Sequence, residues 1–310
     1  MKSGDSQSGT AGTLIVVTGP TGVGKTDIAI RLAREFGTEI ISADSRQIYR
    51  DIPVGTAAPT PEQLAEAKHH FVGTLGLEEY YSAAQFENDV MNLLPSLFER
   101  SPYVVMCGGS MMYVDAVCKG IDNIPTISEE VRNSVAQRYA EHGAEAMRDE
   151  LRKLDGEYYS QVDLNNMKRV IHAIEICEQA GIPYSRLRTG TAKQRPFKTI
   201  KIGLTMPRTE LFDRINRRVL KMIDNGLVEE ARKVYPLRHL NSLNTVGYKE
   251  MFAWIDGSMD YATAVARIQK NTRVYAKKQL TWYAKDPLMQ WFLPTDYGKI
   301  IACCQQHTSL

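Results

Sequence analysis

LIVVTGPTGVGKTDIAIRLA, residues 14–33, carries the most informative pattern in this chain of 310 residues. Its apolar start, residues 14–17, predicts a buried strand, and the apolar positions Ile28, Ala29 and Leu32 predict a helix after a glycine-rich turn. The segment GPTGVGKT matches the phosphate-binding pattern G-x-x-x-x-G-K-[ST] in the strand–loop–helix context that this pattern requires. The chain is therefore expected to have an α/β fold with a P-loop.

The loop between this strand and helix has the chemistry of an anion site. Its glycines allow backbone N–H groups to converge on a phosphate at the helix N-terminus. Lys25 adds a positive charge, and the Thr26 hydroxyl can ligate Mg²⁺. The alternative is a tight glycine turn with a chance lysine. The residues expected to bind the phosphates are Gly19, Pro20, Thr21, Gly22, Val23, Gly24, Lys25 and Thr26.

Composition limits the class of protein. Apolar residues make up 43% and charged residues 24% of the chain, values typical of a protein that buries a proper core. No apolar run reaches the roughly 20 residues that span a bilayer, and no signal-peptide pattern precedes Leu14. Five cysteines without C-x-x-C spacing predict neither a disulfide framework nor a zinc site. We expect a cytoplasmic protein without a membrane partner, with residues 1–12 disordered.

The charge is distributed unevenly along the chain. Residues 1–195 contain 20 basic and 26 acidic side chains, whereas residues 196–310 contain 18 basic and 10 acidic ones. A long helix is expected over residues 261–285, and it carries Lys270, Arg273 and Lys277 on one face with no acidic residue. This arrangement is typical of a helix that follows a nucleic-acid backbone, although a solvated charged face is the alternative.

Two further buried strands are expected to end near the P-loop. The strand over residues 38–42 leads to Asp44, and ligands of open α/β sheets bind beyond the carboxyl ends of strands. At that edge Asp44 could hold Mg²⁺, serve as a general base or cap a helix. The strand over residues 103–107 leads to Cys-Gly-Gly-Ser110, without the acidic residue with which nucleotide hydrolases organise Mg²⁺ and water. Residues 55–61, with two prolines, are expected to form a loop.

Residues 122–195 are expected to form a helical insertion domain. Helices are predicted from Ser128, over residues 144–154 and over residues 166–177, with a polar, basic segment after them. The remaining residues, 13–121 and 196–310, would form the P-loop α/β core with its basic C-terminal helices.

One arginine lies beside an apolar stripe. A helix is expected over residues 209–224 with Thr209 as its N-cap, and helical spacing places Arg218 between Leu211, Ile215 and Met222. Burying an unpaired guanidinium is costly, and a phosphate would satisfy it through a bidentate contact. The alternative is an arginine that extends over the edge of the core into water.

Several segments together resemble one family. GPTGVGKT, EIISADSRQIYRDIPVGTAAP, VMCGGSMMYVDAV, TVGYKEM and TRVYAKKQLTW resemble, in this order and at these separations, segments of the tRNA dimethylallyltransferases (tRNA isopentenyltransferases). The likeness runs from about Thr13 to Leu293. It implies a nucleotide-kinase-like P-loop core with a parallel sheet and a helical insertion domain. It also implies transfer of a dimethylallyl group from dimethylallyl diphosphate to N6 of the adenosine on the 3′ side of the tRNA anticodon.

The resemblance assigns roles to individual residues. Asp44 matches the aspartate that accepts the N6 proton, and Thr21 and Arg218 match groups that stabilise the diphosphate. Lys25 and Thr26 match the groups that bind the phosphates and Mg²⁺. The matches to tRNA contacts are Asp44, Ser45, Arg46, Gln47, Ser110, Arg132, Lys168, Arg169, His172, Lys249, Lys277, Lys278 and Gln279. The implied partners are the tRNA anticodon stem-loop and the prenyl donor, and a monomer is expected because one chain could hold one tRNA.

Some residues differ from the usual family pattern. Ser110 stands where threonine is common and keeps the hydroxyl. Lys249 and Lys278 stand where arginine is common and lack its bidentate fork, and His172 lacks a permanent charge. Two other classes of function compete with the transferase. A small-molecule or nucleotide kinase would use the P-loop for ATP, and a non-catalytic RNA-binding module would carry it as a remnant.

Overall fold

The computed structural model describes residues 12–306, so the segment expected to be disordered lies outside the described residues except for Gly12. The chain divides into two units. The larger unit combines the residues up to Lys119 with those from Gln194 onward, and the smaller unit is Gly120–Lys193. None of the helices between residues 12 and 306 is long and apolar enough to cross a membrane.

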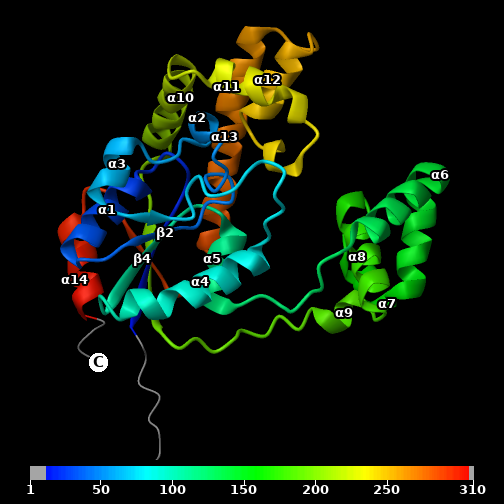
Figure 1. Cartoon of the computed structure of the whole chain (residues 1–310), viewed down its shortest axis with the longest axis horizontal. Helices are drawn as coiled ribbons and strands as arrows, with labels where there is room; N and C mark the ends of the chain where they lie inside the picture. Colours follow the sequence, from blue (N-terminus) through cyan, green and yellow to red (C-terminus); the bar gives the residue numbers. More distant parts are fainter. Residues whose placement is uncertain (1–11, 307–310) are drawn as a thin grey trace, which may run out of the picture. The chain divides into compact units, whose positions relative to one another are not determined.

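A six-stranded sheet forms the centre of the larger unit (Figure 1). Its order is β3-β2-β4-β1-β5-β6, and every neighbouring pair is parallel. The carboxyl ends of β1, β2 and β4 therefore meet at one edge, where ligands of such sheets bind. The strands are β1 (Thr13–Thr18), β2 (Ile40–Ser42), β3 (His69–His70), β4 (Tyr103–Cys107), β5 (Lys198–Leu204) and β6 (Met289–Phe292). This confirms the predicted α/β class with a parallel sheet.

Helices cover both faces of this sheet because its strands are apolar on both sides. Ile15 and Val17 of β1 pack in one core with α1 (Lys25–Glu35) and α14 (Tyr297–Gln306). Leu14 and Val16 pack on the opposite face with α4 (Ala83–Phe98) and α5 (Met111–Lys119). Figure 1 shows these two layers. The core thus fixes the strand ends from both sides.

The loop predicted at residues 55–61 is present at residues 57–60, but the prediction was wrong at both ends, which belong to two short helices. They are α2 (Pro53–Thr56) and α3 (Pro61–Glu66). Thr60 caps α3 by accepting a hydrogen bond from Gln63 N, and the Gln63 side chain reciprocates at Thr60 N. Both helices begin with proline, which the first helical turn accommodates without losing a hydrogen bond.

Four helices form a third apolar cluster with the segment around α2. The prediction that Thr209 caps the first of them was wrong, because Pro207 holds the N-cap position. The four are α10 (Arg208–Asp224), α11 (Leu227–Val234), α12 (Tyr248–Ile255) and α13 (Tyr261–Tyr283). Gly226, with φ of 97°, lies between α10 and α11 and is the N-cap of α11.

The smaller unit is helical and has a core of its own. Val135, Met147, Leu151, Val170 and Ile174 are buried in it. Gly143, with φ of 75°, interrupts the first helix, so residues 129–142 and 144–154 form two arms of one element. Its helices are α6 (Glu129–Leu154), α7 (Gly156–Gln161), α8 (Met167–Ala180) and α9 (Tyr184–Leu187).

Candidate active site

The P-loop connects β1 to α1 with a backbone that only glycine adopts easily. Gly19, Gly22 and Gly24 have φ of 138°, 83° and 105°. A Cβ on Gly19 would lie 2.5 Å from the carbonyl oxygen of Leu204 on the neighbouring strand β5. The three glycines are thus favoured by their backbone conformation, and Gly19 also by its close approach to the sheet.

Lys25 is held against the carbonyls of its own loop. Its Nζ donates hydrogen bonds to Gly19 O at 3.1 Å and Pro20 O at 2.9 Å. Burial, assisted by the nearby Arg218, lowers the pKa of Lys25 to about 8, whereas Asp44 acts in the opposite direction. Burial disfavours the charged form of the amine, whereas a bound anion would favour it and raise the pKa again.

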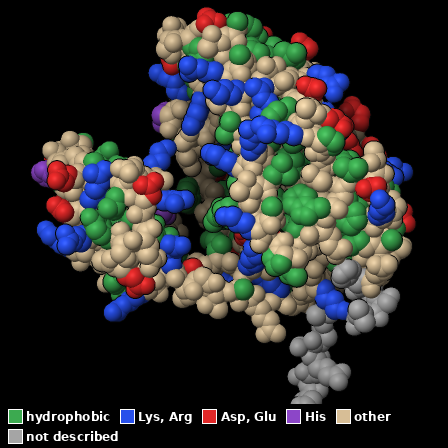
Figure 2. All heavy atoms as spheres, turned by 180° about the vertical axis from the view of Figure 1, so that it is seen from behind, with side chains coloured by type: hydrophobic (Ala, Val, Ile, Leu, Met, Phe, Trp, Pro, Cys, Tyr) green, Lys and Arg blue, Asp and Glu red, His purple; other side chains and the backbone are tan. Residues whose placement is uncertain are grey.

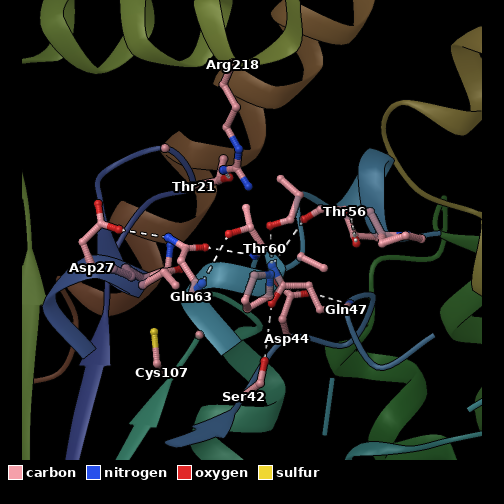
Figure 3. A pocket seen from close by; sticks show the side chains of 18 of the residues that line it. Thr21, Asp27, Ser42, Asp44, Gln47, Thr56, Thr60, Gln63, Cys107 and Arg218 are labelled. Atoms are coloured by element: carbon pink, nitrogen blue, oxygen red, sulfur yellow. Dashed lines mark hydrogen bonds between the residues drawn. The ribbon is translucent and has the colours of Figure 1, made fainter. Parts of the chain in front are cut away.

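Arg218 reaches the P-loop from α10, as Figure 3 shows. Its Nη1 donates a hydrogen bond to Thr21 Oγ1 at 2.9 Å. Burial lowers the pKa of Arg218, and no carboxylate in residues 12–306 forms an ion pair with it. A hydroxyl group satisfies one donor without neutralising the charge, so this half-buried guanidinium is ready to accept an anion.

Asp44 follows β2 and enters the cavity from the side opposite Arg218 (Figure 3). Its Oδ1 accepts hydrogen bonds from the backbone N–H groups of Arg46 at 2.9 Å and Gln47 at 3.3 Å. Asp44 therefore caps a turn at residues 45–48 and not a helix, which was one of the three roles considered for it. No hydrogen bond from residues 12–306 reaches Oδ2, which leaves one oxygen for a ligand.

Two hollows of the larger unit meet at these residues. A cavity of about 500 Å³ contains the P-loop side, with Gly24, Lys25 and Thr26. A second, of about 450 Å³, contains Ser110, Lys249 and other residues beyond Asp44. Both are lined by Thr21, Asp44, Thr56, Arg218 and Met222. A group bound in one hollow can thus meet a group bound in the other beside Asp44 and Arg218.

The wall between the hollows is held by residues that the sequence analysis did not identify. The Glu230 carboxylate accepts hydrogen bonds from Val54 N at 2.8 Å, from Gly55 N at 2.7 Å and from the Tyr248 hydroxyl. A Cβ on Gly55 would lie 2.3 Å from the Tyr248 hydroxyl oxygen. Tyr248 lies in the segment TVGYKEM, but no local sequence pattern indicates its contact with α2.

The first hollow contains another cation that was missed. Arg214 lies one helical turn before Arg218, and its Nη2 lies 3.5 Å from the position of a Cβ on Gly24. It makes no hydrogen bond or ion pair within residues 12–306. Helical spacing from Arg218 was the available signal, because positions four residues apart share a face.

The predicted RNA contacts of the larger unit have different environments. Ser110 Oγ accepts a hydrogen bond from Ser45 N at 2.8 Å, and Arg46 Nη1 donates to Asn241 O and Ser242 O at 3.0 Å. Gln47 donates to Thr56 O at 3.3 Å and Ala57 O at 3.1 Å. Lys249, Lys277 and Lys278 are exposed. Figure 2 shows lysine and arginine side chains gathered on one face of this unit.

Gln279 differs from these neighbours. Its side chain is 1% exposed, and its Oε1 accepts a hydrogen bond from Thr21 N at 2.8 Å. Its Nε2 donates to Gly109 O at 2.9 Å. The structure therefore places Gln279 behind the P-loop, and its amide is already engaged on both sides.

The other predicted RNA contacts belong to the smaller unit. Lys168, Arg169 and His172 are exposed on α8, away from the buried stripe that contains Val170. His172 Nδ1 lies 3.5 Å from Glu175 Oε2, one helical turn away. Arg132 is partly exposed on α6. None of these four residues lines either hollow.

The residues of the site fit a metal that is bound together with phosphate oxygens. Residues 12–306 contain no group of three His, Cys, Asp or Glu side chains that could hold a metal ion. Thr26 lines the first hollow, and its hydroxyl has no hydrogen-bond partner in the described chain. Mg²⁺ commonly binds through one or two protein oxygens, phosphate oxygens and water, and this donor set fits that mode.

Comparison with known proteins places this geometry in context. A family profile described as IPP transferase matches residues 47–286. A protein of Phocaeicola vulgatus named tRNA dimethylallyltransferase 1 is 56% identical over 289 residues, which cover 93% of this chain and 96% of that protein.

Solved structures agree with these matches. A full-length tRNA isopentenylpyrophosphate transferase from Bacillus halodurans is 33% identical, with a TM-score of 0.70, over 96% of this chain and 98% of that one. A eukaryotic dimethylallyltransferase studied as it acts on tRNA is 25% identical, with a TM-score of 0.72, over 87% of this chain and 69% of its own.

Proposed function

Because this chain belongs to the tRNA dimethylallyltransferase family, we propose that its two hollows bring a prenyl donor and an RNA base together. Dimethylallyl diphosphate binds in the hollow that contains the P-loop. The adenosine on the 3′ side of the tRNA anticodon enters the other, and its N6 receives the dimethylallyl group as diphosphate leaves. The observation that carries the proposal is that Asp44 and Arg218 line both hollows.

Asp44 supplies the base. The exocyclic N6 is a weak nucleophile, because its lone pair is delocalised into the ring. As the N6 lone pair attacks the allylic carbon, one N6 proton passes to Asp44 Oδ2. Oδ1 keeps its bonds to the amides of Arg46 and Gln47, which hold the carboxylate in one orientation. A positioned general base contributes about a hundredfold to ten-thousandfold in rate.

The P-loop side stabilises the leaving diphosphate. The carbon–oxygen bond breaks and its electron pair stays on the diphosphate, so negative charge grows on that oxygen. Loop N–H groups, Lys25, the Thr21 hydroxyl and the Arg218 guanidinium surround this region. Mg²⁺ held by the Thr26 hydroxyl would neutralise part of the diphosphate charge. Groups fixed before the reaction stabilise such charge most effectively.

The RNA must present an unstacked base. Extruding a base costs a few kcal/mol, and the cost is smallest for an unpaired loop base. Contacts from Ser45, Arg46, Ser110, Lys249 and the lysines of α13 would offset it. One chain contains both hollows and the basic helix, so we propose that a monomer suffices. We also propose that the protein works in the cytoplasm, where thiols such as its five free cysteines stay reduced.

A single labelling experiment tests this function against its rivals. The protein is incubated with labelled dimethylallyl diphosphate or labelled ATP, with and without the anticodon stem-loop. We expect label from the prenyl donor to appear in RNA, and no label to move from ATP. ATP-dependent labelling of a small molecule would establish a kinase, and binding of RNA without transfer would establish a non-catalytic module.

Arg214 offers a prediction within this function. The Arg214 guanidinium lies unpaired against the P-loop, where it could bind the diphosphate. We therefore expect Arg214→Ala to raise KM for the prenyl donor about tenfold, the effect of losing one charged hydrogen bond to the diphosphate. Arg217→Ala is the matched control, because Arg217 is exposed on the same helix. Steady-state kinetics with saturating stem-loop measure both. Equal donor KM in the two variants would remove Arg214 from the donor site.

A further inference from the structure

Gln279 joins three segments that are distant in the sequence. It lies near the end of α13 and is buried, whereas the preceding Lys277 and Lys278 are exposed. Its Oε1 accepts the backbone N–H of Thr21 in the P-loop, at 2.8 Å. Its Nε2 donates to the carbonyl of Gly109, between β4 and α5, at 2.9 Å. One side chain thus connects the P-loop, the end of β4 and the basic helix.

The fit around this amide is tight. A Cβ on Gly109 would lie 2.3 Å from Gln279 Nε2 and 3.6 Å from Lys25 Nζ. Glycine at position 109 is therefore what allows the Gln279 amide to approach the P-loop. A buried amide that is hydrogen-bonded through both its oxygen and its nitrogen prefers one orientation, because any other leaves polar groups unpaired.

We propose that Gln279 is a positioning residue for the prenyl donor. This inference rests on the proposed function. Gln279 fixes the Thr21 backbone, and Thr21 in turn presents its hydroxyl to Arg218 at 2.9 Å. Thr21 and Arg218 line both hollows, so a displaced Thr21 would move the groups that meet the leaving diphosphate.

The same helical turn then has two separate tasks. The exposed Lys277 and Lys278 are placed to meet the RNA backbone from outside, and the buried Gln279 holds the donor loop from inside. Residues on successive positions of a helix point about 100° apart, which separates these tasks on one element. Gln279 thus belongs to the side of the prenyl donor, although its sequence neighbours Lys277 and Lys278 are expected to contact RNA.

The test compares Gln279→Leu with Lys278→Ala. Leucine fills a similar volume and removes both hydrogen bonds. We expect Gln279→Leu to lower kcat/KM for dimethylallyl diphosphate by about tenfold to a hundredfold, with the Kd of the anticodon stem-loop within about twofold of wild type. Lys278→Ala should weaken stem-loop binding and reduce its salt dependence, with donor KM unchanged. Direct binding of dimethylallyl diphosphate by calorimetry gives a readout independent of turnover.

A second variant protects the test against a folding defect. Gln279→Glu keeps an oxygen that can accept from Thr21 N but loses the N–H group that donates to Gly109 O. Its affinity for dimethylallyl diphosphate should therefore fall below that of wild type, while stem-loop binding persists. Thermal melting of all variants checks the fold. If Gln279→Leu proves to be unfolded, the kinetics of Gln279→Glu decide the test. Wild-type donor kinetics in the folded Gln279 variant would overturn the inference. So would weakened stem-loop binding with unchanged donor affinity.

The outcome separates this inference from the proposed function. A wild-type protein that transfers no dimethylallyl label to RNA contradicts the function itself. Transfer by wild type, with unaltered donor kinetics in the Gln279 variants, contradicts only the role of Gln279.

Discussion

Asp44→Asn is expected to lower kcat by about a thousandfold while leaving the Kd of the anticodon stem-loop within about twofold of wild type. Asparagine has nearly the same shape and keeps an oxygen that can accept from Arg46 N and Gln47 N. It cannot take a proton from N6. Single-turnover transfer of labelled dimethylallyl to the stem-loop, with excess protein, measures the chemical step directly.

The alanine variant separates the base from the cap. Asp44→Ala removes the proton acceptor and also the two hydrogen bonds at Oδ1, so it should lose activity and about 0.5–2 kcal/mol of stability. Asp44→Asn should lose activity with little change in melting temperature. Near-normal turnover in the asparagine variant would show that Asp44 only caps the turn and that the base lies elsewhere.

The fold class could be predicted from the sequence because the patterns that indicate it are local. The apolar run 103–107 coincides with β4, and the P-loop pattern specifies a strand, a turn and a helix in immediate succession. The errors are also local in origin. Residues 55–61 contain two prolines and read as a loop, yet proline at the first helical position and the capping box at Thr60 favour short helices.

The site depends on contacts that no local pattern encodes. Arg218 could be seen to border an apolar stripe, but its partner Thr21 lies 197 positions away. Gln279 has the same difficulty, because it sits among basic residues and its partners Thr21 and Gly109 are 258 and 170 positions away. Only the family resemblance suggested Asp44, Thr21 and Arg218 together, and their catalytic roles stay predictions.

The burial of polar side chains on helices explains why such residues are hard to predict from the sequence. A polar side chain in an amphipathic helix is normally assigned to the solvent face. Gln279 is instead buried because the P-loop and the Gly109 carbonyl satisfy its amide, which offsets the cost of leaving water. Arg218 is half-buried, and its hydrogen-bond partner in the described chain is the Thr21 hydroxyl. A bound anion would add the opposite charge that this guanidinium lacks.

The second large effect is expected for Arg218→Ala. Its guanidinium stands beside Thr21 where both hollows meet, so removing it should lower kcat by about a hundredfold to a thousandfold. The loss should appear mainly in kcat, because the leaving oxygen carries more negative charge in the transition state than in the bound donor. Single-turnover rates and calorimetric binding of dimethylallyl diphosphate, measured on the same preparation, distinguish this from weaker donor binding.

Two comparisons make the Arg218 result specific. Arg218→Lys keeps a positive charge but loses the fork that can contact Thr21 and a phosphate oxygen together, so its rate should lie between those of alanine and wild type. Arg217→Ala removes a charge from the exposed face of the same helix and should leave kcat unchanged. Added guanidinium ion should partly restore Arg218→Ala, because the deleted side chain leaves space for it beside the diphosphate. An unchanged kcat in Arg218→Ala, with weaker binding of the stem-loop, would instead place Arg218 on the RNA side of the junction.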